Sequence, residues 1–167
     1  SSSGHLSAGS YAGAESVDSL SGADASNYTL SNPLTGNYTV TPKAVTVDAT
    51  AANKVYDATT TATVTGLTGN GVITGDTVNF ADTAANFSDK NVGTAKTVTV
   101  SGITASGADA GNYTVAPTAT TTANITPKAL TGSLADGSSV YGDPLAPGAA
   151  TLTGVVAGDT VSAGPVT

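Results

Sequence analysis

Short stretches in which apolar and polar residues alternate occur along much of the chain. The clearest are AVTVDA at residues 44–49 and TVTVSGI at residues 97–103, where Val98 and Val100 share one face and threonines the other. A period of two is typical of a strand with one buried face. Further strands are predicted at residues 36–40, 61–65, 113–115, 120–125 and 129–134, with another starting at residue 76. No stretch of eleven or more residues has helical periodicity, so the pattern predicts an all-β protein.

The alternating pattern is repeated along the sequence. GADAGNYTV begins at residue 107 and a near copy, GADASNYTL, begins at residue 22, so Tyr113 lies 85 residues after Tyr28. The TPKA motif recurs at the same distance, and VYGDP at residue 140 follows VYDAT at residue 55 by 85 residues. Self-similarity at a fixed spacing indicates repeated structural modules, here of about 85 residues.

The repeat predicts where the modules begin and end. Residues 1–42 are predicted to be the C-terminal half of one module, residues 43–127 a complete module, and residues 128–167 the N-terminal half of the next. Pro42 and Pro127 mark the junctions, because proline fixes its own φ and restricts the residue before it. The two halves together contain the parts of one whole module.

The sequence leaves the architecture within the all-β class open. An immunoglobulin-like sandwich is favoured, and a β-grasp-like module with one short helix is the alternative. Residues 81–91 or 105–110 would have to supply that helix, and neither has an apolar stripe. Phe87 is predicted to anchor the core, because large aromatic side chains are few.

Charge and composition exclude several classes of function. The net charge is −7, and the five cationic residues are all lysines, so no basic patch is available for nucleic acid or for an anionic membrane surface. No apolar run approaches the length needed to span a bilayer. The chain has no cysteine and a single histidine, His5, so Ser/His and Cys/His catalytic arrangements are absent and no enzyme is expected. No cofactor is expected either.

Calcium is the one ligand that the acidic residues suggest. The candidates are Asp24 and Asp109 in the GADA motifs and Asp76 and Asp159 in the GDTV motifs, because carboxylates suit a hard cation. The sequence lacks the regular ligand spacing of a calcium loop. The favoured interpretation is that each aspartate caps its own turn.

Recurring tyrosines are predicted to be framework residues. They form two pairs at equivalent positions of the repeat, Tyr28 with Tyr113 and Tyr56 with Tyr141. This recurrence favours a core role with the hydroxyl at the surface over a sugar-stacking platform. The lysines of the TPKA motifs, Lys43 and Lys128, are predicted to be solvated, with an isopeptide bond as the alternative.

VYDAT, GADAGNYTV and TPKA together resemble the YDG repeat modules of very large bacterial surface adhesins, including filamentous-haemagglutinin-like proteins. The VYGDP motif at residues 140–144 is similar to MBG modules of the same proteins. Ala58 stands where glycine is commoner in the YDG signature. The resemblance implies a non-enzymatic stalk or adhesive array on the outside of a bacterium, with motif residues that are structural.

The leading hypothesis is therefore a structural segment of an extracellular adhesin stalk or biofilm matrix fibre. Its partners would be adjacent modules or copies of itself, and neighbouring copies would complete the split modules of a head-to-tail filament. A module that binds glycans or a host surface is the second hypothesis, and a calcium-rigidified linker is the third. An exposed aromatic cluster flanked by aspartates would favour the second.

Overall fold

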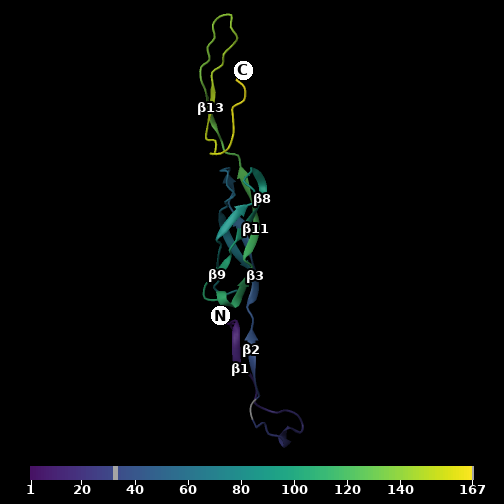
Figure 1. The fold of residues 1–167 in the computed structure, drawn as a ribbon. Coiled ribbons are helices and arrows are strands. Elements are labelled where there is room, and N and C mark those ends of the chain that lie inside the picture. Colours follow the sequence, from purple (N-terminus) through teal and green to yellow (C-terminus); the bar gives the residue numbers. More distant parts are fainter. Residues whose placement is uncertain (32–33, 167) are drawn as a thin grey trace. The chain divides into compact units, whose positions relative to one another are not determined.

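The computed structural model describes residues 1–31 and 34–166, and almost all of its regular structure is β-strand (Figure 1). Asn32, Pro33 and Thr167, which belong to the predicted half modules, lie outside the described residues. The chain divides into two compact units that each combine three segments. The first is Ser1–Ala49, Leu67–Thr83 and Ser101–Ala119, and the second is Thr50–Gly66, Ala84–Val100 and Thr120–Thr167. Four of the five crossings between the units fall within strands, and none falls at Pro42 or Pro127. The module boundaries stay a prediction.

The first unit contains three small sheets. The first is an antiparallel hairpin of β1 (Gly9–Val17) and β2 (Leu34–Val40). The second has the strand order β10 (Tyr113–Val115), β3 (Lys43–Ala51) and β5 (Val64–Asn70), and β10 is parallel to β3. A third pair joins β6 (Asn79–Ala81) to β9 (Thr104–Ser106). Two single turns of 3-10 helix, η1 (Ala25–Asn27) and η2 (Ala110–Asn112), precede Tyr28 and Tyr113.

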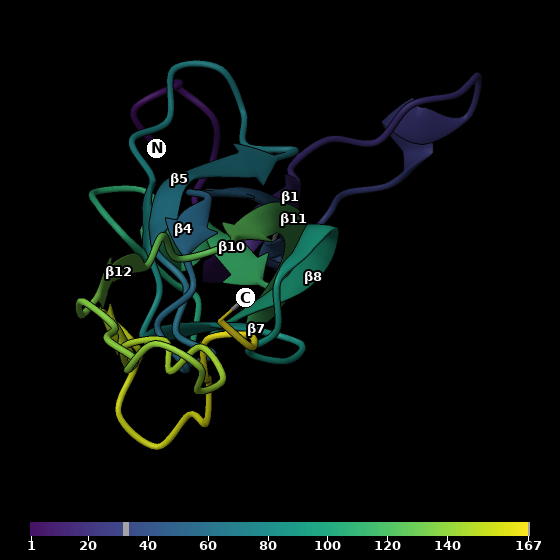
Figure 2. The same ribbon diagram turned by 90° about the horizontal axis from the view of Figure 1, so that it is seen from above.

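The second unit is built on a four-stranded sheet in the order β4 (Lys54–Val55), β11 (Thr118–Thr126), β8 (Gly93–Ser101) and β7 (Ala84–Phe87). Figure 2 shows β8 and β7 side by side. The last residues form a separate antiparallel hairpin of β12 (Thr131–Leu134) and β13 (Ala150–Thr153).

Each unit has its own small core. Alternate residues of β3 point inward in the first unit, where Val45, Val47 and Ala49 are buried with Ile103 and Tyr113. In the second unit the buried side chains are Ala62, Ala85, Phe87, Val98, Val100, Ala123 and Ile125. The period of two seen in the sequence is thus the alternation between buried and exposed faces. The predicted burial of Phe87 is confirmed, since this side chain is 3% exposed.

The strand expected at residues 61–65 is displaced in the structure. β5 runs from Val64 to Asn70, and Thr61 makes only an isolated bridge to Asn86. Two glycines therefore lie inside the strand and not in a turn. A side chain at Gly69 would come within 2.5 Å of the Phe80 ring, so glycine is needed for a close approach and not for a bend.

The all-β prediction is confirmed, and neither stretch proposed for a short helix forms an α-helix. Residues 81–91 contain β7, and residues 110–112 form a single 3-10 turn. Within the described residues, no helix is long and apolar enough to cross a membrane.

Residues 128–166 contrast with the complete copy of the same sequence. Every residue of β12 is exposed, and Leu134 is 58% exposed, whereas its counterpart Ala49 is 8% exposed. Tyr141 is fully exposed, whereas its counterpart Tyr56 is half-buried. The hairpin therefore presents side chains that the complete copy covers.

Candidate functional site

Two aspartates from the sequence-predicted set lie together in the first unit. Asp76 ends a turn in which its N–H donates to the Ile73 carbonyl at 3.0 Å. Asp109 precedes η2 and exchanges two hydrogen bonds with Thr77. The Thr77 N–H donates to Asp109 Oδ2 at 2.8 Å, and the Asp109 N–H donates to the Thr77 carbonyl at 3.2 Å. This exchange fixes the two acidic loops against each other.

The Asp76–Asp109 pair holds the beginning of the chain. The Ser2 N–H donates to Asp109 Oδ1 at 2.9 Å, and the Ser3 N–H donates to Asp76 Oδ1 at 3.0 Å. The Tyr113 hydroxyl donates to Asp76 Oδ2 at 2.6 Å. All four carboxylate oxygens therefore accept a hydrogen bond, which satisfies both charges, although Asp109 is only 3% exposed.

These contacts determine the protonation of the pair. Hydrogen bonds from Ser3 and then from Tyr113 lower the pKa of Asp76 from 3.8 to about 2. Hydrogen bonds from Ser2 and Thr77 likewise lower the pKa of Asp109. Burial, followed by the bond to Asp76, raises the pKa of the Tyr113 hydroxyl. Both carboxylates are ionised at neutral pH, and Tyr113 is a neutral donor.

A glycine permits the close approach of the two acidic loops. Gly107 has a φ of +112°, and a side chain there would lie 2.6 Å from the Thr77 carbonyl oxygen. Gly22 holds the same place in the GADA copy with a φ of +121°, but its side-chain position is open. The two copies thus share a local backbone, and only the copy at Gly107 has a neighbour.

The calcium candidates fall into two environments. Asp76 and Asp109 have hydrogen-bond donors on every oxygen, so a cation would have to displace N–H and O–H groups. Asp24 is exposed, and neither it nor Asp109 makes a side-chain bond to its own 3-10 turn, unlike the predicted self-capping. Among the described residues, no group of three or more acidic, histidine or cysteine side chains could hold a metal ion.

The fourth candidate, Asp159, lies in the second unit in a related setting. Its N–H donates to the Val156 carbonyl at 3.0 Å, the turn also seen at Asp76. The Asp159 carboxylate beside the Tyr56 hydroxyl is the main cause of the raised pKa of Tyr56. The Lys90 Nζ is 3.9 Å from Asp159 Oδ1. Asp159 therefore contacts the preceding copy of the sequence, as Asp76 contacts Ser3.

Asp76 and Asp159 each border a cavity of about 170 Å³. The first cavity, within the first unit, is lined by Lys43, Ile73 and Asp76 and by residues of the first segment that include His5 and Leu6. The second, within the second unit, is lined by the counterparts Lys128, Val156 and Asp159, together with Tyr56, Val92 and Pro127. The same kinds of residue thus surround a hollow at both predicted junctions.

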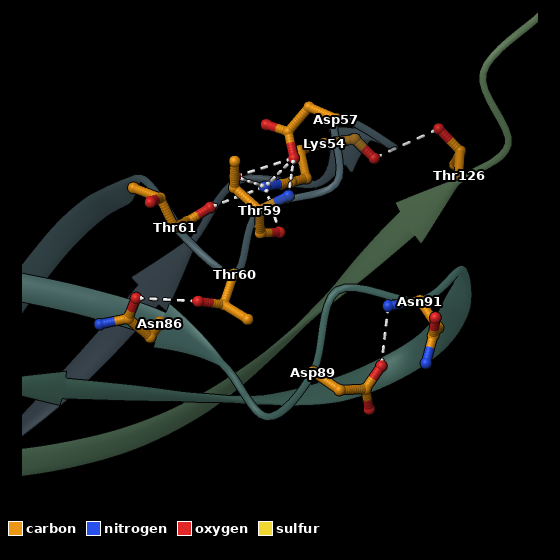
Figure 3. A network of polar contacts seen from close by, with 9 residues as sticks. All are labelled: Lys54, Asp57, Thr59, Thr60, Thr61, Asn86, Asp89, Asn91 and Thr126. Atoms are coloured by element: carbon orange, nitrogen blue, oxygen red, sulfur yellow. Dashed lines mark hydrogen bonds and ion pairs between the residues drawn. The ribbon is translucent and has the colours of Figure 1, made fainter. Parts of the chain in front are cut away.

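The YDG-like motif forms a compact polar turn in the second unit (Figure 3). The Lys54 Nζ lies 2.7 Å from Asp57 Oδ1 and donates to the carbonyls of Thr59 and Thr61, both at 3.0 Å. The Thr59 N–H donates to Asp57 Oδ1 at 2.9 Å, so Asp57 caps its own turn. Bonds from Lys54 and Thr59 lower the pKa of Asp57 to about 2. Lys54 also lies over the Phe87 ring, 5.7 Å from its centroid.

The backbone conformation at Ala58 explains why glycine is common at this position of the motif. Its φ is +64°, in the left-handed region that side chains disfavour. Asp57 and Thr59 hold the turn on either side of it, which over-determines the conformation.

The predicted framework residues have different exposures. Tyr113 is 8% exposed and Tyr56 is half-buried, whereas Tyr28 is 70% exposed and Tyr141 is fully exposed. Pro42 separates β2 from β3, and Pro127 follows β11 and borders the second cavity. The structure brings Tyr113 to Asp76 and Tyr56 to Asp159, two contacts that the sequence did not predict. Their only sequence signal is the recurrence of both partners.

Comparisons with known proteins identify one domain. Neither a curated protein nor a solved structure matches the chain. Residues 41–123 match the family model of the YDG domain, a range that includes the Lys54–Asp57 turn and both aspartates of the Asp76–Asp109 pair. This part of the chain is therefore similar to YDG domains.

Proposed function

We propose that the chain is a structural repeat segment of a bacterial extracellular adhesin stalk or matrix fibre. Successive modules are joined at Pro42 and Pro127, and each carries load to the next through its junction.

One observation carries the proposal. The GDTV motif occurs twice, and in both places its aspartate contacts the preceding copy of the sequence. Asp76 accepts a hydrogen bond from the Ser3 N–H, and Asp159 lies near Tyr56 and Lys90. A binding site for an outside ligand need occur only once, whereas a contact between successive modules must recur in every module. The recurrence therefore favours a mechanical role.

The chemistry of the first junction also suits a stalk. Ser2 and Ser3 are held through backbone N–H groups, which every residue except proline possesses. The preceding module can thus vary in sequence without losing the contact. Charged acceptors strengthen such bonds.

Two measurements test the proposal. Antibodies against the purified chain should label intact cells that make the protein, and external protease should remove the label. In the purified chain, Asp109→Ala should speed amide exchange at Ser2 and Thr77, whereas Asp24→Ala, at the exposed copy of that position, should leave both unchanged. Label confined to the cell interior would contradict the stalk, and equal exchange in the two variants would contradict the junction.

Exposed Tyr28 favours one alternative function. It borders an open hollow with Leu20, Leu30 and Asp24, which has the aromatic and acidic character of a sugar-binding surface. Specific retention on a glycan array that Tyr28→Ala abolishes would support binding over a stalk. For the calcium-rigidified linker, a melting midpoint that falls with chelator would be required.

A further inference from the structure

Asn70 is followed by Gly71, and this is the one asparagine–glycine pair of the sequence. Each of the other asparagines precedes proline, lysine or a residue with a branched or aromatic side chain. An asparagine before glycine is chemically labile, because glycine has no Cβ to keep its peptide nitrogen away from the asparagine side chain. The sequence therefore contains one position at which a side-chain amide is prone to react with the main chain.

The pair lies at an exposed corner of the first unit. Asn70 is the last residue of β5, and Gly71 begins the turn that follows, with a φ of +94°. β5 is the outer strand of its sheet and lies beside β3. Asn70 and Gly71 are both exposed, so water and hydroxide can reach them.

Two charged side chains of β3 flank the pair. The Asn70 Nδ2 donates to Asp48 Oδ2 at 2.6 Å, which holds the amide on the surface of the sheet. The Lys43 Nζ lies 4.0 Å from the position that a Cβ of Gly71 would occupy. A positive charge beside Gly71 favours loss of the proton from its peptide nitrogen, the step that makes this nitrogen a nucleophile.

The next copy of the repeat lacks the pair. LTGNGV at residues 67–72 corresponds to LTGV at residues 152–155, so the two missing residues are the asparagine and the glycine. The turn that follows forms in both copies, closed at 3.0 Å by the N–H of Asp76 in one and of Asp159 in the other. The turn thus does not require the pair, which gives the complete copy a reactive position that the next copy does not have.

We infer that Asn70 is a modification site, at which the side-chain amide is hydrolysed through a cyclic imide formed with Gly71. The Gly71 nitrogen loses its proton to hydroxide and attacks Asn70 Cγ. A bond forms between Cγ and the Gly71 nitrogen, and the bond from Cγ to Nδ2 breaks as Nδ2 takes a proton from water and leaves as ammonia. Water then opens the imide at either carbonyl, which leaves aspartate or isoaspartate at residue 70.

Both products change the contact between β5 and β3. A carboxylate at residue 70 would face Asp48 where an N–H now donates to it, so an attractive contact becomes a like-charge repulsion. Isoaspartate also adds a methylene group to the main chain at the last residue of β5, which displaces the turn relative to the strand. The reaction therefore adds negative charge and loosens the edge of this sheet. The inference does not depend on the proposed stalk function.

Incubation of the purified chain at mildly alkaline pH, followed by proteolysis and mass spectrometry, tests the inference. The peptide that contains Asn70 should gain about 1 Da, whereas peptides that contain Asn112 or Asn124 should stay unchanged. Isoaspartyl methyltransferase with a labelled methyl donor should mark the isoaspartate fraction. Asn70→Gln should remove both signals, because glutamine would have to form a larger ring.

Matched variants test the roles of the two neighbours. Lys43→Gln should slow the mass gain about three-fold, whereas Lys128→Gln, at the equivalent position of the next copy, should leave it unchanged. Asn70→Asp, which reproduces one product, should speed amide hydrogen exchange in β5 about two- to five-fold. Adding Asp48→Asn to that variant should restore slow exchange, because the like-charge contact is then removed.

Absence of a mass gain at Asn70 in the folded chain, while the chain unfolded in urea reacts, would overturn the inference, since the fold would then protect the pair. Equal rates in Lys43→Gln and Lys128→Gln would overturn the role of the Lys43 charge. Unchanged exchange in Asn70→Asp would overturn the effect on the sheet. None of these results bears on the stalk proposal, which the labelling of intact cells tests separately.

Discussion

Replacing Ala58 with glycine should stabilise the part of the chain that matches the YDG domain, although such a change normally weakens a folded protein. Ala58 has a φ of +64° in a turn fixed by Asp57 and Thr59. A left-handed conformation costs a residue with a side chain roughly 1–2 kcal/mol. Glycine avoids this cost but gains freedom in the unfolded chain, which offsets about 0.4–1 kcal/mol.

Ala58→Gly should therefore raise the free energy of unfolding by about 0.5 kcal/mol. Loss of the methyl group reduces this gain little, because Ala58 is only half-buried. For a domain of this size, the gain corresponds to about 2–4 °C in the melting midpoint. Ala81→Gly is the matched control. Ala81 is exposed in β6 without a positive φ, so its replacement should cost about 0.5–1 kcal/mol.

Urea and thermal unfolding followed by far-ultraviolet circular dichroism would measure both variants, because the chain has no tryptophan. The two changes are chemically identical, so general effects of glycine cancel in the comparison. Opposite signs are expected. A loss of stability in Ala58→Gly as large as that in Ala81→Gly would refute the assignment of strain to this turn.

Three further perturbations address the Asp76 site and the core. Gly107→Ala should destabilise the chain by about 1–3 kcal/mol more than Gly22→Ala in urea unfolding, because only Gly107 faces the Thr77 carbonyl; equal losses would contradict this. The pKa of Asp76 is lowered to about 2, so its contribution to the free energy of unfolding should be complete above about pH 4 and disappear as the pH falls through 2. An Asp76→Asn variant should lack this component when the free energy of unfolding is measured against pH. Ile125→Ala should cost about 2–5 kcal/mol, since the side chain is 1% exposed, and a loss below about 1 kcal/mol would show that the site repacks.

The sequence predicts strand positions well where alternation is strict. The stretch at residues 44–49 lies within β3, and residues 113–115 coincide with β10. The prediction fails at β5, where glycine lies within the strand because it accommodates the Phe80 ring. Local composition does not distinguish a glycine that bends the chain from one that makes room for a neighbour.

The sequence identified Asp76 and Asp109 as candidate residues, but it did not predict that they lie together. Each aspartate follows a glycine-containing motif, and each resembles a self-capping turn residue. The actual partners, Thr77 and Ser2 for Asp109, are 32 and 107 residues away along the chain. Such contacts depend on which strands pair, and a parallel pairing such as β10 with β3 leaves no local sequence signal.

The acceptor aspartate recurs in the repeat, whereas the group of the preceding copy that it meets differs between the two places. Asp76 and Asp159 recur, whereas the groups that meet them differ, a backbone N–H at Ser3 and a tyrosine hydroxyl at Tyr56. Under the proposed stalk, the same aspartate position would recur in every module of a longer array.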